Sequence, residues 1–249
     1  MVGVAARVLL VEDDPSLGSA VVSVLASAGH EVRWARTLDR AREAVGKHEP
    51  DLLVLDLGLP DGDGLELCSE LRARGSDTVV VVLTAQTAET EAVRALEGGA
   101  DDFVAKPFRP GELVARLQAH LRRRPHGAGE TRVGAVRVDS GRRQAWRADV
   151  LLPLRPKEFE LLAALIMRAG TTVGRETLID EVWDENWSGS TKTLDVHIAS
   201  LRRKLADAGD RWERIVTVRG YGYRFDADPP SVGSSAGAAP TSVGSAADS

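Results

Sequence analysis

The sequence predicts two domains in tandem, a doubly wound α/β domain with a five-stranded parallel sheet and then a small α+β domain. The 249 residues are about right for two compact domains. The first half alternates short apolar runs with longer amphipathic ones, and the second half carries short strands, three helices and a closing hairpin. The apolar runs at 52–55 and 79–83 do not alternate with polar residues, so we expect both faces of their sheet to be buried.

In the first domain, five short apolar segments are expected to be strands: Arg7–Val11, Glu31–Ala35, Asp51–Leu55, Thr78–Leu83 and Asp102–Ala105. Five amphipathic segments are expected to be helices: Pro15–Ala28, Leu38–Lys47, Gly64–Ala73, Thr87–Gly98 and Arg109–Arg123. Pro15 suits a first helical turn, and Gly29 and Gly75 suit helix ends. Repeated strand–helix units form a doubly wound, flavodoxin-like sheet whose functional groups lie at the carboxyl ends of the strands.

We place the first domain at residues 1–124, a linker at 125–130, the second domain at 131–226 and a disordered tail at 227–249. The second domain is expected to begin with strands, followed by helices and a hairpin. The expected strands are Val133–Val138, Arg143–Arg147 and Val150–Leu154; the helices are Pro156–Arg168, Arg175–Trp183 and Ser190–Leu205; the hairpin is Ile215–Arg219 with Tyr221–Phe225. Strands, three helices and a hairpin in this order resemble a winged helix.

Composition excludes several classes of protein. No apolar stretch is long enough to span a bilayer and no signal-peptide pattern is present, so we expect a cytoplasmic protein without membrane contact. The single cysteine, Cys68, cannot form an internal disulfide. With 32 basic and 37 acidic residues, the chain is not a polycation. Residues 1–125 nevertheless have a net charge of −5, whereas residues 190–224 hold 8 basic and 4 acidic side chains, which hints at nucleic-acid contact by the second domain.

Acidic and hydroxyl side chains follow the expected strands of the first domain. Glu12 and Asp13 end the first strand, Asp56 ends the third, and Thr84 ends the fourth, while Lys106 ends the fifth. These ends meet at one edge of a parallel sheet, where crowded carboxylates repel one another unless a cation lies among them. Oxygen ligands in an open cluster suit Mg²⁺. The set predicts phosphoryl transfer to a carboxylate nucleophile; for any single acid, helix capping is the simpler interpretation.

The motifs LVEDD at 10–14, LDLGLPDGDG at 55–64, LTA at 83–85 and KPF at 106–108 resemble the receiver domain of bacterial two-component response regulators. The resemblance implies that Asp56 accepts a phosphoryl group from a sensor histidine kinase. It implies that Glu12, Asp13, Asp56 and the backbone carbonyl of Gly58 hold Mg²⁺. It further implies that Thr84 and Lys106 contact the phosphoryl group and that Phe103 is the switch aromatic.

The segments GADDF at 99–103 and GELVAR at 111–116 resemble the dimerising face of the OmpR/PhoB family. By that resemblance three charge pairs cross a two-fold axis in a homodimer: Arg94 with Glu112, Asp101 with Arg116, and Asp102 with Arg123. Reciprocal opposite charges suit an isologous contact. Ion pairs within one chain are the alternative.

The expected helix Ser190–Leu205 is amphipathic. Leu194, Ile198, Leu201 and Leu205 form one apolar stripe, and we expect Thr193, Val196, Ser200 and Arg203 on the opposite, open face. Arg202 and Lys204 flank that face and suit phosphates, as does Lys192. A helix of this size fits the DNA major groove, although an amphipathic surface helix without that role is the alternative.

The segments PKEFELL at 156–162, LDVHI at 194–198 and TVRGYGYRF at 217–225 resemble the OmpR/PhoB winged-helix DNA-binding domain. The resemblance implies that 190–205 is the recognition helix for double-stranded DNA, and that Arg219 is the wing arginine that reaches a minor groove. It implies that the loop from Trp183 to Gly189 meets RNA polymerase. Ala199 and Ser200 stand where relatives often carry arginines, so the operator cannot be copied from a relative.

The sequence therefore predicts a transcriptional regulator, not an enzyme beyond its own phosphotransfer and dephosphorylation, that phosphorylation of Asp56 switches toward dimerisation and operator binding. One alternative is a winged-helix regulator that works without phosphorylation. The other is a phosphohydrolase with an aspartate nucleophile; haloacid-dehalogenase-like enzymes carry a second aspartate two residues past the nucleophile, where this chain has Gly58.

Overall fold

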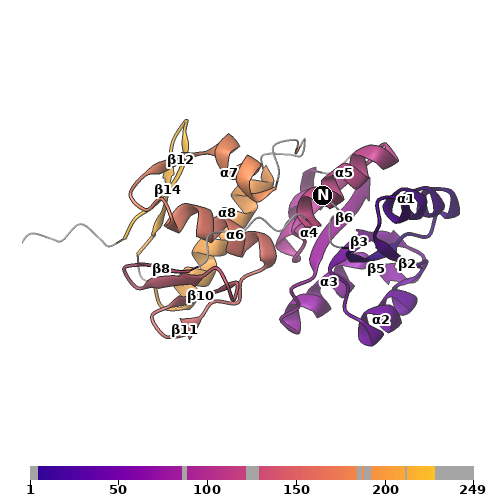
Figure 1. Ribbon diagram of the computed structural model, residues 1–249, viewed down its shortest axis with the longest axis horizontal. Helices are drawn as coiled ribbons and strands as arrows, with labels where there is room; N and C mark the ends of the chain where they lie inside the picture. The colour runs from indigo at the N-terminus through magenta and orange to yellow at the C-terminus, as the bar shows by residue number, and fades with distance from the viewer. Residues whose placement is uncertain are drawn as a thin grey trace, which may run out of the picture.

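The computed structural model describes residues 5–85, 89–121, 129–183, 187, 192–210 and 212–227. These residues form two domains, coloured from indigo to magenta and from orange to yellow in Figure 1. The first is α/β and the second α+β, as the sequence predicts. None of the helices in these ranges is long and apolar enough to cross a membrane.

The first domain is built on a parallel sheet of order β2-β1-β3-β6-β7. Its elements are β1 (Arg7–Val11), α1 (Pro15–Ser27), β2 (Glu31–Ala35), α2 (Leu38–Lys47), β3 (Leu52–Asp56), β4 (Gly58–Leu59), β5 (Gly62–Asp63), α3 (Gly64–Ala73), β6 (Val79–Ala85), α4 (Glu89–Glu97), β7 (Asp102–Lys106) and α5 (Pro110–Leu121). All five predicted strands are confirmed. The short antiparallel pair β4–β5 is not predicted, because two-residue strands leave no periodic signal.

Helices cover both faces of this sheet, which explains its continuous apolar strands. Alternate residues of one strand serve opposite faces: Leu53 and Leu55 pack with α2 and α3, whereas Leu52 and Val54 pack with α1 and α5. All four leucine and valine side chains of β3 are fully buried. The central strand that ends at Asp56 is therefore rigidly held.

The second domain contains two antiparallel sheets, of order β11-β10-β9-β8 and β12-β14-β13, around a helical core. Its elements are β8 (Glu130–Val133), β9 (Val136–Asp139), β10 (Gln144–Arg147), β11 (Val150–Leu151), α6 (Pro156–Ile166), β12 (Thr172–Gly174), α7 (Arg175–Val182), α8 (Lys192–Asp207), β13 (Ile215–Val218) and β14 (Gly222–Phe225).

Two strand predictions in this domain need correction, and one strand is not predicted. The single strand expected at 133–138 is divided into β8 and β9, because Gly134 turns the chain with a φ of 58°. The strand expected to reach Leu154 ends at Leu151, two residues before Pro153. The short β12 is not predicted; it pairs with β14 in the hairpin sheet. Residues 125–128 of the predicted linker and 228–249 of the predicted tail lie outside the described residues, and Glu130, the last residue of the predicted linker, begins β8.

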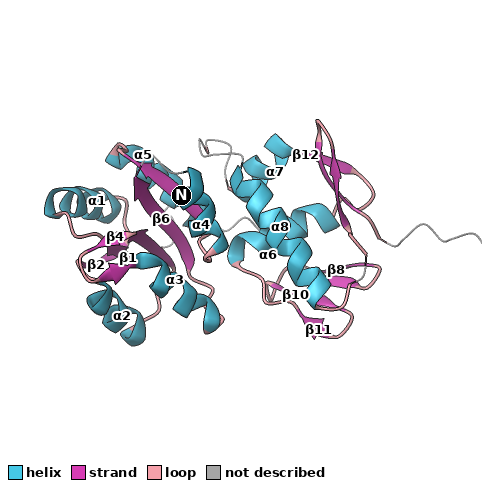
Figure 2. Ribbon diagram, turned by 180° about the vertical axis from the view of Figure 1, so that it is seen from behind, coloured by secondary structure: helices cyan, strands magenta, loops and turns pink. Residues whose placement is uncertain are grey.

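The two domains meet along α4. This helix belongs to the first domain and packs against α8 of the second. Figure 2 places α4 between strand β6 and the helices α6 and α8, and the same order is visible from the opposite side in Figure 1. The helix predicted to read DNA thus lies beside the first domain.

Candidate phosphoacceptor site and DNA-binding helix

Side chains at the end of β2 hold the backbone of the acidic pair Glu12 and Asp13, which follows β1. The indole Nε1 of Trp34 donates to the carbonyl of Glu12 at 2.8 Å, and the Arg36 guanidinium donates to the carbonyl of Asp13 at 3.0 Å. The next residue, Asp14, caps α1 by accepting from the amides of Ser16 and Leu17. Those two hydrogen bonds hold the pKa of Asp14 below its usual value. Asp14 is therefore a helix cap, and the two acids before it are available to the site.

Three predicted carboxylates converge at the carboxyl edge of the sheet. Oxygens of Glu12, Asp13 and Asp56 all lie within 4.8 Å of one another. The Lys106 Nζ from β7 donates to both Glu12 and Asp56 at 2.8 Å. Glu12 is 1% exposed and Asp56 9% exposed. Four residues from three different strand ends thus form one polar cluster, as the strand-end pattern predicts.

The charges of this cluster are strongly coupled. Burial and the neighbouring charge of Asp56 raise the pKa of Glu12 in spite of the Lys106 hydrogen bond. Burial would lower the pKa of Lys106, but the hydrogen bonds to Asp56 and Glu12 outweigh it and raise that pKa. Lys106 therefore remains cationic. The cluster holds more negative than positive groups, and its oxygen donors fit a hard divalent cation such as Mg²⁺.

The backbone around Asp56 is closely packed. The amide of Gly58 donates to Asp56 Oδ1 at 3.3 Å, which orients the carboxylate. A Cβ placed on Gly64, at the start of α3, would lie 2.5 Å from the carbonyl oxygen of Asp56. Only glycine permits this close approach between α3 and the acceptor residue.

Thr84 lies on β6 and Phe103 on β7, the two strands that follow β3 in the sheet. Thr84 is 3% exposed and its hydroxyl donates to Glu91 on α4 at 2.9 Å. Phe103 is half-buried and packs against the core on the α2 and α3 face of the sheet. The peptide bond between Lys106 and Pro107 is cis. Thr84 is thus at the carboxyl edge of the sheet, whereas Phe103 is the second residue of β7 and lies three positions before that edge.

The prediction for the open face of α8 is wrong for two residues. Thr193 is completely buried and Ser200 is 6% exposed, while Val196 is half-buried. Ser200 donates to the buried carboxylate of Glu158 on α6 at 2.7 Å, so it packs inside the protein. The apolar stripe Leu194, Ile198, Leu201 and Leu205 is buried as predicted. Helical periodicity located the core stripe but could not reveal that neighbours cover a second face.

The basic side chains of α8 and the wing divide into two groups. Arg202 donates to the carbonyl of Ile215 at 2.6 Å and to the hydroxyl of Thr217 at 2.8 Å, and Lys204 donates to the carbonyl of Pro153 at 2.6 Å. These cations join α8 to its own domain. Lys192, Arg203 and Arg219 are exposed.

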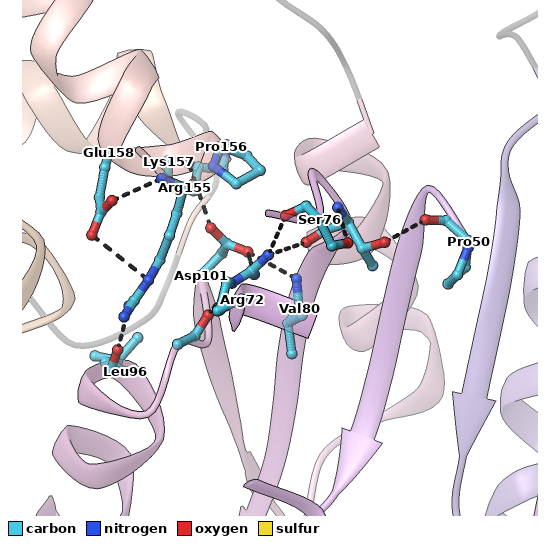
Figure 3. A network of polar contacts seen from close by, with 12 residues as sticks. Pro50, Arg72, Ser76, Val80, Leu96, Asp101, Arg155, Pro156, Lys157 and Glu158 are labelled. Carbon is cyan, nitrogen blue, oxygen red and sulfur yellow. Dashed lines mark hydrogen bonds and ion pairs between the residues drawn. The ribbon is translucent and has the colours of Figure 1, made fainter. Parts of the chain in front are cut away.

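A buried aspartate joins the two domains. Asp101, the residue before β7, is fully buried and accepts from Arg72 at 2.7 Å and from the amide of Val80 at 2.9 Å. Its other oxygen lies 3.5 Å from the amide of Lys157 on α6, and its carbonyl accepts from the Trp183 indole at 3.3 Å. Figure 3 shows this network crossing from the first domain to α6.

Two further contacts cross the same boundary. The carboxylate of Asp102 is fully buried, 2.9 Å from His120 Nε2 and 2.9 Å from the Trp187 indole nitrogen. Burial would raise the pKa of Asp102, but these hydrogen bonds and the Arg116 charge outweigh it and lower that pKa. Arg155 of the second domain donates to the carbonyl of Leu96 at 2.8 Å (Figure 3) and to that of Glu97 at 3.3 Å.

The residues predicted to pair across a dimer all have partners within this chain where they are described. Arg94 pairs with Asp63, Glu112 lies 3.9 Å from Arg116, and the two aspartates are held as above. Arg123 lies outside the described residues. In the loop predicted to meet RNA polymerase, the described residues are Trp183 and Trp187; both contact the first domain, and residues 184–186 and 188–189 lie outside the described ranges.

Comparison with known proteins agrees with this architecture. Residues 8–118 match the response regulator receiver domain, and residues 149–225 match the transcriptional regulatory protein C-terminal domain. The DNA-binding response regulator MtrA of Mycolicibacterium smegmatis is 38% identical over 225 residues, which cover 90% of this chain and 97% of that protein. The transcriptional regulatory protein BasR of Escherichia coli is 39% identical over 223 residues, covering 89% and 98%. The solved structure of a RitR mutant superimposes with a TM-score of 0.71 at 26% identity, covering 88% and 98%.

A receiver with an acidic edge joined to a DNA-binding domain defines a two-component response regulator, a DNA-binding regulator of transcription. The chain belongs to the OmpR/PhoB family of these regulators.

Several residues important to the structure carry no local sequence signal. Glu91 binds Thr84, Arg72 binds Asp101, and Glu158 binds Ser200. Each pair joins residues on different elements, so no motif or periodicity could have found it. One sequence signal points to the contact between the domains: Trp183 and Trp187 are two large aromatic residues in a single short loop.

Proposed function

We propose that Asp56 is the phosphoacceptor of this regulator. The observation that carries this proposal is the juxtaposition of three carboxylates within 4.8 Å with Lys106 in contact with two of them. An oxygen of the Asp56 carboxylate attacks the phosphorus of a phosphohistidine on the sensor kinase. The P–N bond breaks, the imidazole nitrogen leaves with the electron pair and takes up a proton, and an acyl phosphate remains on Asp56.

Each neighbour of Asp56 has a defined role in this transfer. Glu12, Asp13, Asp56 and the carbonyl of Gly58 would hold Mg²⁺, which neutralises charge on the phosphoryl oxygens. Lys106, already 2.8 Å from Asp56, supplies a positive charge to the same oxygens. The Thr84 hydroxyl donates to a phosphoryl oxygen, and Phe103 follows Thr84 inward.

The second domain binds double-stranded DNA through α8 and the wing. Exposed Lys192, Arg203 and Arg219 are suited to contact phosphates, and Val196 adds an apolar contact to the bases. Thr193 and Ser200 are buried, and Ser200 is bound to Glu158 of its own domain, so neither belongs to this surface. The packing of α4 on α8 supports a closed, weakly binding form that must open before α8 enters a groove.

Phosphorylation would favour the open form and a homodimer through α4, β7 and α5. The charge pairs of this dimer are Arg94 with Glu112, Asp101 with Arg116, and Asp102 with Arg123. In the closed form the Asp101 carboxylate lies 3.5 Å from the Lys157 amide and the Asp102 carboxylate 2.9 Å from the Trp187 indole nitrogen, so domain contact and dimerisation compete for the same side chains. Opening also breaks the hydrogen bonds of Trp183 and Trp187 to the first domain, so that their loop can meet RNA polymerase.

The test compares the full chain with its Asp56→Asn variant, each with Mg²⁺ and with or without acetyl phosphate. Sedimentation measures dimerisation, and anisotropy of a labelled duplex measures DNA binding. The proposal predicts that acetyl phosphate increases both in the wild type and neither in Asp56→Asn. An equal response of both proteins would contradict it, and binding without any response to phosphodonor would indicate a phosphorylation-independent regulator.

A further inference from the structure

The hydroxyl of Thr84 is already occupied in this structure. Its Oγ1 donates to Glu91 Oε2 at 2.9 Å, and Thr84 is 3% exposed. A threonine hydroxyl has a single proton to donate. It therefore cannot donate to Glu91 and to a phosphoryl oxygen on Asp56 at the same time. Glu91 and the phosphoryl group compete for one donor.

Glu91 lies in the first half of α4, and the second half of that helix holds the other domain. Arg155 donates to the last carbonyls of α4, those of Leu96 and Glu97, and α4 packs against α8. The helix is thus attached to Thr84 near its start and to Arg155 of the DNA-binding domain at its end. A shift of α4 away from Thr84 would therefore also disturb its contact with the DNA-binding domain.

We propose that Glu91 is a positioning residue that holds Thr84 away from the acceptor and holds α4 in the place that docks α8. This inference rests on the proposed phosphorylation of Asp56. Phosphorylation replaces the −1 charge of the Asp56 carboxylate with an acyl phosphate of about −2, so the acceptor edge becomes about one charge more negative, and the phosphoryl oxygens draw the Thr84 hydroxyl toward themselves. Glu91 then loses its donor and meets a like charge, so α4 is released from the edge and α8 from α4.

If this is correct, the Thr84–Glu91 hydrogen bond slows phosphorylation of Asp56 and weakens DNA binding by the unphosphorylated protein. Glu91→Ala removes the acceptor and the charge, and Glu91→Gln keeps an acceptor oxygen but removes the charge. Thr90→Ala is the matched control, since Thr90 is an exposed residue of the same helix. Hydrogen bonds to charged acceptors change equilibria about tenfold or more, and partial exposure reduces this, so we expect an effect of about fivefold.

The experiment uses the full chain with Mg²⁺ and acetyl phosphate and follows the initial rate of phosphoryl uptake. Affinity for a labelled random-sequence duplex is measured separately without phosphodonor. Glu91→Ala is expected to react about fivefold faster and to bind the duplex about fivefold more tightly than wild type. The rate and the affinity of Glu91→Gln should lie between those of wild type and Glu91→Ala, and those of Thr90→Ala should match wild type. A merely structural role for Glu91 would lower thermal stability without accelerating phosphoryl uptake.

Two failures are distinguishable. If wild type and Thr90→Ala take up phosphoryl groups while both Glu91 variants react at the same rate or more slowly, the role of Glu91 is wrong and the proposed function stands. If wild type takes up no phosphoryl group, the proposed function fails and this inference fails with it. Should Glu91→Ala not fold, an unaltered rate in Glu91→Gln is sufficient to overturn the inference.

Discussion

The hydrogen bond between Trp187 and Asp102 permits a direct test of the closed form. Trp187→Phe removes the indole N–H that lies 2.9 Å from a fully buried carboxylate and keeps most of the aromatic surface. Hydrogen bonds to charged groups contribute about 1.5–3 kcal/mol. Because Asp102 keeps its contact with His120, the lower value applies. A loss of about 1.5 kcal/mol increases the ratio of open to closed molecules roughly tenfold.

The assay is anisotropy of a labelled random-sequence duplex with the unphosphorylated full chain at fixed salt. Since the closed form covers part of α8, tenfold more open protein should bind about tenfold more tightly, as long as the closed form predominates. Trp212→Phe is the matched control, because Trp212 is 44% exposed. If a folded Trp187→Phe binds the duplex no better than Trp212→Phe, the contact between the domains does not restrain α8 and the account of the closed form is wrong.

Other perturbations test separate parts of the account. Asp102→Asn should lower the free energy of unfolding at pH 7. Because the pKa of Asp102 in the folded protein is depressed below 3.8, the stabilisation by its charge is complete above pH 3.8 and is lost as the pH falls through the folded-state pKa. Chemical unfolding curves of variant and wild type should therefore converge in acid, and a constant difference would contradict this. Gly64→Ala should destabilise the receiver by about 1–3 kcal/mol, because the new methyl meets the Asp56 carbonyl; an unchanged melting temperature would show that α3 moves freely. Arg219→Ala should weaken DNA binding across sequences and reduce the salt slope by about 1, and an unchanged slope would place the wing away from phosphates.

The receiver fold could be predicted because its signals are local. Unbroken apolar runs such as Leu52–Leu55 identify a sheet covered on both faces, and the parallel topology then brings Glu12, Asp56 and Lys106 to one edge. Short strands such as β12 could not be predicted, since three residues carry too little pattern. The acidic cluster followed from topology without knowledge of any distance.

The surroundings of α8 could not be predicted because they depend on long-range contacts. Periodicity identified the stripe that includes Leu194 and Leu201, but the burial of Ser200 depends on Glu158, 42 positions away in sequence. The docking of Asp101 and Asp102 onto the second domain likewise joins residues far apart in the chain, 56 positions for Asp101 and Lys157 and 85 for Asp102 and Trp187. A helix pattern indicates one buried face, and only the assembled protein reveals the second.

The central claim is that the carboxylate of Asp56 receives the phosphoryl group. After incubation with Mg²⁺ and acetyl phosphate, reduction with borohydride converts an aspartyl phosphate to homoserine, and peptide mass spectrometry locates the converted residue. We predict homoserine at position 56 and at no other aspartate, and none in Asp56→Asn. Homoserine at another aspartate, or none in wild-type protein that has gained a phosphoryl group, would contradict the account.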